Sequence, residues 1–116
     1  MFNSQYDFND GNGPVPAHQH VNPDGSVGGW IADTAQVAAT AYIGPDAVVF
    51  GNAQVSGDAL VYGSAQVSKN AQVFENARVY GSALVYGNAR VYRSARVYGS
   101  AQVFGDAWVC GNEVKK

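Results

Sequence analysis

A valine or isoleucine recurs at every sixth position through most of this chain, and no other feature constrains its fold as strongly. The series runs from Ile31 to Val109, has fourteen members and never slips by a residue. Each member from Val37 onward has an alanine two residues before it. A period of six fits neither an amphipathic helix, which repeats about every 3.6 residues, nor one long alternating strand. The chain therefore has to be a repeat protein built from short units.

Each unit combines a very short strand with a bend. Within Ala-x-Val-x the alanine and the valine point to one side, as alternate residues of a strand do. The two residues that follow are turn formers: glycine fills the first position in eight units, and Asn, Asp, Ser or Thr fills the second in all fourteen. Three such units close a triangular coil of eighteen residues. Successive coils then pair as parallel strands about 4.8 Å apart.

We therefore predict an all-β chain whose main domain, residues 29–112, is a parallel β-helix shaped as a triangular prism of four to five coils. Stacked valines belong in the interior and alanines at the corners, because a close-packed core has no room there for larger side chains. Residues 1–28 lack the repeat and hold three of the four prolines, which predicts an extended N-terminal arm or a cap. Residues 113–116 are predicted as a charged C-terminal tail.

The units also resemble a known family. Residues 85–90 have the sequence Val-Tyr-Gly-Asn-Ala-Arg, which is similar to the repeats of bacterial and prophage proteins of the YdcK type. The segment Gly28-Gly29-Trp30-Ile31 is similar to the one that precedes the repeats in those proteins. The resemblance covers residues 29–112 and implies the left-handed hexapeptide-repeat β-helix and a phage or prophage origin. The left hand comes from the resemblance alone, since the usual rule for crossovers between parallel strands favours the right hand.

Cysteine content, targeting signals and charge exclude several classes of protein. Cys110 is the single cysteine, so no internal disulfide is possible. We see no targeting segment and no membrane-spanning run, and we expect a protein of the bacterial cytoplasm or of a virion, with no membrane partner. Residues 1–58 carry six acids and no Lys or Arg, whereas residues 59–116 carry all seven bases and three acids. The excess of bases over acids in residues 59–116 is too small to indicate nucleic acid binding. The opposite net charges of the two halves nevertheless favour contact between unlike ends.

Outward side chains eighteen residues apart share one face of the predicted prism, which gives three faces. Face one carries a contiguous set of large apolar side chains: Trp30, Val48, Phe50, Leu84, Tyr86 and Phe104. An apolar patch of this kind marks an association surface, so we predict a homo-oligomer, with a trimer favoured, joined through face one. The alternative is that the arm folds back over face one with Phe2, Tyr6 and Phe8.

Face three carries a column of tyrosines, Tyr62, Tyr80 and Tyr98, with arginines beside it. Planar guanidinium groups next to aromatic rings suit an anion attached to a ring, because they combine paired hydrogen bonds with stacking. The predicted ligand site consists of Arg78, Tyr80, Tyr92, Arg93, Arg96 and Tyr98, and its simplest ligands are a nucleotide or a charged sugar. The alternative is a solvated ladder that only stabilises its sheet.

The repeats lack the residues that catalysis on this fold would need. Acyltransferases with this fold use a histidine on the prism wall, whereas His18 and His20 both lie in the arm. We therefore predict no enzymatic activity and no cofactor. Alternate residues of an extended arm point to one side, so His18 and His20 leave open a metal site on a trimer axis. An exposed histidine pair without metal is the alternative.

These observations favour a non-catalytic, oligomeric β-solenoid that binds or sequesters a ligand or serves as a structural module. Two other hypotheses remain. One is a divergent acyltransferase-like enzyme with its site between subunits. The other is a virion component that docks through its N-terminal arm.

Overall fold

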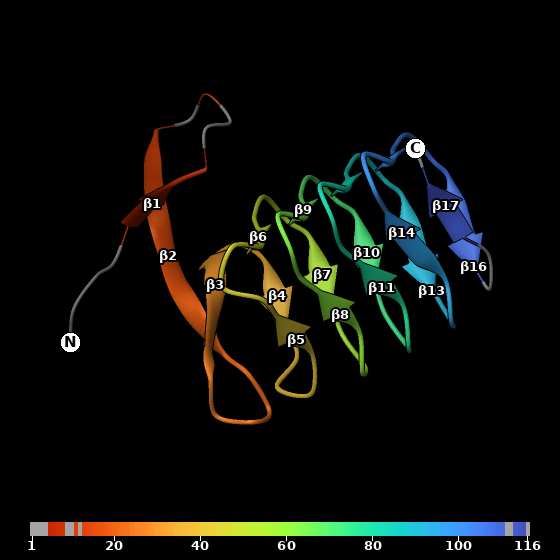
Figure 1. The fold of residues 1–116 in the computed structure, drawn as a ribbon. Helices are drawn as coiled ribbons and strands as arrows, with labels where there is room; N and C mark the ends of the chain where they lie inside the picture. Colours follow the sequence, from red (N-terminus) through yellow and green to blue (C-terminus); the bar gives the residue numbers. More distant parts are fainter. Residues whose placement is uncertain (1–4, 9–10, 12, 111–112, 116) are drawn as a thin grey trace.

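The structure is a computed structural model that describes residues 5–8, 11, 13–110 and 113–115. These residues form β-strands joined by turns, and none of them lies in a helix. Consequently the described part of the chain contains no helix able to cross a membrane. The strands assemble into three sheets that run along a solenoid, with β1 and β2 at its N-terminal end (Figure 1). The predicted all-β solenoid is confirmed, while its left hand stays a prediction.

Each sheet of the described residues forms one face of the prism. The sheet of face one has seven strands, in the spatial order β1 (Gln5–Asp7), β2 (Pro14–Val21), β3 (Val27–Ala32), β6 (Val48–Val49), β9 (Gln66–Val67), β12 (Leu84–Val85) and β15 (Gln102–Val103). The sheet of face two has five, namely β4 (Gln36–Val37), β7 (Gln54–Val55), β10 (Gln72–Val73), β13 (Arg90–Tyr92) and β16 (Trp108–Cys110). The sheet of face three also has five, namely β5 (Tyr42–Ile43), β8 (Leu60–Val61), β11 (Arg78–Val79), β14 (Arg96–Tyr98) and β17 (Glu113–Lys115).

The strand register follows the sequence period. Val79 lies opposite Val97 in a parallel pair, and Val73 lies opposite Val91, so partners stand eighteen residues apart. The last pair departs from this rule, because β17 pairs with β14 in a register that sets Val97 opposite Val114. Residues 113–115, which we predicted as part of a tail, therefore add a strand to the sheet of face three.

The interior of the prism is filled by the valine row of each face and by the alanines two residues before the valines. From Val49 to Val97 every valine of the series is at most 1% exposed, and every alanine of the series from Ala41 to Ala101 is completely buried. Burying one valine side chain stabilises the fold by about 1.5–3 kcal/mol. The series thus supplies the core by repetition, with alanines wherever the chain bends.

The turns from Gly51 to Gly105 have a left-handed backbone at their first position. Gly51 has a φ of 66°, and a Cβ built on it would lie 2.8 Å from the backbone nitrogen of Lys69 in the next coil. Three non-glycine residues, Lys69, Glu75 and Arg93, adopt the same conformation with φ near 60°. A side chain in this region costs about 1–2 kcal/mol. These three turns are therefore strained points in an otherwise regular solenoid.

The arm extends the sheet of face one beyond the first coil. Strand β2 pairs antiparallel with β3, and β1 pairs antiparallel with β2, so the arm adds two strands at the N-terminal edge (Figure 1). This edge would otherwise present unpaired backbone groups to solvent, which invites pairing with another chain. The arm is therefore an integral cap of one sheet.

Side chains of the arm cap a second sheet. The Asn22 amide donates to the Ile43 carbonyl at 3.0 Å and accepts from the Ile43 N–H at 2.8 Å, so it substitutes for a neighbouring strand at β5. The His20 Nε2 lies 2.9 Å from the Ala41 carbonyl oxygen, to which it donates. Both side chains are buried, at 3% and 7% exposure. The Ala41 carbonyl and the Ile43 backbone groups are thus satisfied by polar side chains whose position no repeat dictates.

Candidate ligand-binding site

The tyrosines of face three form a stacked column. The ring centroids of Tyr62 and Tyr80 are 4.9 Å apart with planes 2° from parallel, and those of Tyr80 and Tyr98 are 5.2 Å apart at 6°. Each tyrosine follows the buried valine of its unit, and consecutive units of one face stand eighteen residues apart. Parallel pairing of β8, β11 and β14 therefore sets one ring above the next. The predicted tyrosine ladder exists in the structure.

Two arginines run beside this column. Arg78 and Arg96 are register partners on β11 and β14, and both are exposed. Arg78 has Leu60 as its other strand neighbour. Among the described residues no carboxylate forms an ion pair with Arg78. Because Arg78 lies two residues before Tyr80 on the same strand face, its guanidinium and the tyrosine ring project from one side of the sheet.

Tyr92 and Arg93 lie apart from the four predicted site residues of face three, which are Arg78, Tyr80, Arg96 and Tyr98. Tyr92 belongs to the sheet of face two, where it stacks on Phe74 with centroids 5.1 Å apart and planes 3° from parallel. Arg93 occupies the corner between faces two and three, with its guanidinium carbon 5.9 Å from the Tyr92 ring centroid. A hydrogen bond with the Cys110 side chain raises the pKa of the Tyr92 hydroxyl above its ordinary value, and desolvation adds to this. The six predicted residues thus divide into four on face three and two around the adjacent corner.

Face two has one cationic contact that was not predicted from the sequence. The Arg90 guanidinium carbon lies 5.0 Å from the centroid of the Trp108 ring, which is 64% exposed. The two residues are register partners on β13 and β16. Their separation of eighteen residues was the signal that could have found this pair, since it places an arginine beside a tryptophan on one face.

The structure divides face one into a covered and an open part. Trp30 stacks on Tyr6 of the arm at a centroid distance of 5.1 Å, and Phe50 stacks on Phe8 at 4.8 Å. Val48 packs against the same cluster. The arm therefore covers the N-terminal part of this face through Tyr6 and Phe8, whereas Phe2 lies outside the described residues.

The open part of face one carries Leu84, Tyr86 and Phe104. Tyr86 stacks on Phe104 with centroids 5.4 Å apart, and Phe104 is 54% exposed. This is a smaller apolar surface than the predicted one, and it lies at the C-terminal half of the solenoid.

The two histidines engage different partners. His18 Nδ1 lies 2.8 Å from the Asp33 carboxylate, and both side chains are 55% exposed. His20 is buried and uses its Nε2 on the Ala41 carbonyl. In the part of the chain that the structure describes, no three side chains of His, Cys, Asp or Glu gather in a group that could hold a metal ion.

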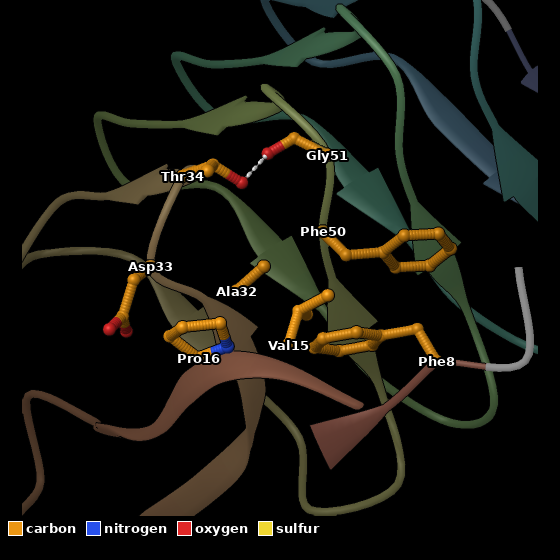
Figure 2. Close-up of a pocket in the computed structure, with 8 residues that line it drawn as sticks. All are labelled: Phe8, Val15, Pro16, Ala32, Asp33, Thr34, Phe50 and Gly51. Atoms are coloured by element: carbon orange, nitrogen blue, oxygen red, sulfur yellow. Dashed lines mark hydrogen bonds between the residues drawn. The ribbon is translucent and has the colours of Figure 1, made fainter. Parts of the chain in front are cut away.

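A cavity of about 330 Å³ lies between the arm and the first two coils (Figure 2). Its apolar lining comes from Phe8, Val15, Pro16, Ala32 and Phe50, and its polar lining from Asp33 and Thr34. The Thr34 hydroxyl donates to the Gly51 carbonyl, which closes one wall. The repeat pattern could not reveal this space, because three of its eight lining residues belong to the arm.

The three parallel sheets and their eighteen-residue register define the class of this protein: it is a parallel β-solenoid. A family model described as YdcK Beta solenoid repeat matches residues 53–69, 71–86 and 83–99. In these three segments the chain is similar to YdcK beta-solenoid repeats, and the segments include the tyrosine column of face three. No curated protein and no solved structure matches the chain.

Proposed function

We propose that this protein is a non-catalytic binding module and that face three binds an anionic ligand that carries a ring, most simply a nucleotide. The observation that carries the proposal is the parallel column of Tyr62, Tyr80 and Tyr98 with Arg78 and Arg96 in register beside it. Rings held within 6° of parallel cover each other's inner faces, so a ligand ring can stack only on an end of the column or on a guanidinium plane beside it, and Arg78 offers paired donors to an anion.

Binding at this surface requires a ligand that carries both the ring and the anion. A charge-assisted hydrogen bond contributes about 1.5–3 kcal/mol, and an aromatic contact adds about 0.5–1.5 kcal/mol beyond its buried area. Neither contribution alone offsets the cost of immobilising a small ligand, so this surface favours a ligand that makes both contacts. Arg78 and Arg96 are register partners, so an anion bound by Arg78 also reduces the repulsion of like charges on these neighbouring strands.

Calorimetry with three related probes tests this proposal. AMP carries both ring and anion, adenosine carries the ring, and inorganic phosphate carries the anion. We expect measurable binding of AMP only, and at least about a tenfold weaker Kd for Arg78→Gln, equivalent to about 1.4 kcal/mol. Arg90→Gln on face two is the matched control and should bind AMP as the wild type does. Equal losses in both variants would mean that AMP responds only to overall charge, and the proposal would fail.

We also propose that copies of the chain associate through the open part of face one, with a trimer as the favoured state. The support is the stacked pair Tyr86–Phe104 beside Leu84, with Phe104 more than half exposed although it is a large apolar side chain. An apolar row outside the cluster that Tyr6 and Phe8 cover gains stability by contact with an identical row.

A further inference from the structure

We propose that the cavity under the arm is a second binding site, specific for a small apolar molecule with one or two rings whose polar end is neutral or cationic. This site lies on a different part of the molecule from face three and does not depend on the function proposed above. The arm supplies one wall, and the first two coils supply the other.

The cavity lies where a face-one position that carries a ring in three of the five coils is an alanine. Phe50, Tyr86 and Phe104 occupy this position in their units, whereas Ala32 in the first coil and Ser68 in the third lack a ring. Phe8 of the arm replaces part of the missing ring by stacking on Phe50 at 4.8 Å and 17°. The space that remains beside Ala32 is the cavity, as the close-up of its lining shows (Figure 2).

The size and lining of the cavity set the class of ligand. An apolar cavity of about 150 Å³ holds a benzene molecule, and ligand sites start at about 300 Å³. A volume of about 330 Å³ therefore accepts one or two fused rings. Phe8, Val15, Pro16 and Phe50 offer carbon surface, while the Thr34 hydroxyl is already engaged with a backbone carbonyl. The interior thus favours a hydrocarbon framework over a polar one.

Asp33 determines the charge preference at the rim. Its carboxylate points away from the stacked rings of Phe8 and Phe50 (Figure 2) and accepts from His18 Nδ1. A carboxylate at the rim attracts an ammonium group and repels a second carboxylate. The acidic composition of residues 1–58, with no Lys or Arg, acts in the same direction.

Three indole derivatives test the proposal on the full-length protein. Indole is neutral, tryptamine carries an ammonium group and indole-3-acetate carries a carboxylate, while the ring system is constant. Titrations followed by protein NMR should shift the methyl signals of Ala32 and Val15 for indole and tryptamine. Because one half-exposed charge pair contributes modestly, we expect tryptamine to bind about fivefold more tightly than indole-3-acetate. In Asp33→Asn this ratio should fall below about twofold while indole binds as before.

A filling variant locates the site independently. Val15→Phe should occupy the cavity from the arm and abolish indole binding, whereas Val21→Phe on the same strand is exposed and should leave it unchanged. Should Val15→Phe fail to fold, Ala32→Leu fills the space from the solenoid side. Absence of any shift at Ala32 and Val15 with saturating indole would overturn the proposal. So would unchanged indole binding in a folded filling variant, or shifts confined to the tyrosine column of face three.

Discussion

The repeated coils and the N-terminal arm are stabilised in different ways. In the coils, position within the unit decides the contact: valines fill the interior, and residues eighteen apart stack on each other outside it. In the arm, contacts are individual, as in the stacking of Tyr6 on Trp30 and the bonds of Asn22 to Ile43. The coils are thus stabilised by the same contacts repeated in every unit, whereas the arm depends on a few specific contacts.

The two regions also differ in the chemistry that they present. The arm and the first coils are acidic and enclose an apolar cavity with a carboxylate at its rim. The later coils carry the arginines, together with columns of stacked aromatic rings on the outside of the prism. One solenoid can therefore offer two unlike surfaces, because the outward positions are free to vary while the inward ones are fixed.

The largest effect is expected from overpacking a coil corner. Ala77 is completely buried, and its neighbours above and below are equally buried alanines. Ala77→Leu inserts three carbon atoms where backbone corners meet, which we expect to cost at least about 3 kcal/mol in the free energy of unfolding. Urea unfolding measures this loss, and the outward substitution Gln54→Leu should change stability by less than about 0.5 kcal/mol. A tolerated leucine at position 77 would contradict the corner packing.

A smaller but still large loss is expected from the cap. Asn22→Leu leaves the Ile43 N–H and carbonyl without their bonds in a buried place, at a cost of about 2 kcal/mol. Hydrogen exchange at the Ile43 amide should increase, while exchange in the later coils stays slow. Asn88→Leu removes an exposed turn amide and serves as the control. Uniformly faster exchange along the whole chain would show that the cap and the coils unfold as one unit. That result would contradict the separate stabilisation of the arm and the coils.

Self-association should respond only to the open part of face one. Leu84→Glu places a charge in the proposed contact and should weaken association at least about tenfold, equivalent to about 1.4 kcal/mol. Val27→Glu is the control, because Val27 is 57% exposed on β3. Sedimentation velocity across a dilution series measures both. A monomeric wild type at micromolar concentration would eliminate the proposed contact.

The smallest effect is a gain in stability at a strained turn. Arg93 has a φ of 58°, so Arg93→Gly should raise the free energy of unfolding by about 1 kcal/mol. Gly81→Ala is the reciprocal change and should lower it, since the added Cβ would lie 2.8 Å from the backbone nitrogen of Gly99. Thermal unfolding of the two variants checks the opposite signs. A destabilised Arg93→Gly would mean that the Arg93 side chain makes contacts that outweigh its backbone strain.

The fold could be predicted from sequence because a period of six fixes strand, turn and register together. The same arithmetic placed Tyr80 over Tyr98 and Arg78 beside Arg96, and the structure has both. It also assigns Tyr92 to face two, where the structure has it, so a corner of the prism separates Tyr92 from the face-three residues with which it was grouped.

For the arm, the sequence offered the alternative that Tyr6 and Phe8 fold back over face one, but it did not give the individual contacts. Nothing in the sequence spacing indicates that Phe8 stacks on Phe50 or that Asn22 bonds to β5, because these contacts depend on how β2 turns back along β3. The cavity next to Ala32 was hidden for the same reason. Contacts between a repeat and a segment that does not repeat have no periodic signal.

The most direct test of the account is an NMR map of AMP binding to the wild-type protein. The proposed function predicts that the largest amide and side-chain shifts fall on β8, β11 and β14, with Tyr80 and Arg78 foremost. It also predicts that Arg78→Gln removes these shifts while Arg90→Gln retains them. Shifts centred on Trp108 and Arg90 of face two, or no shifts at millimolar AMP, would contradict the claim that face three is a ligand-binding surface.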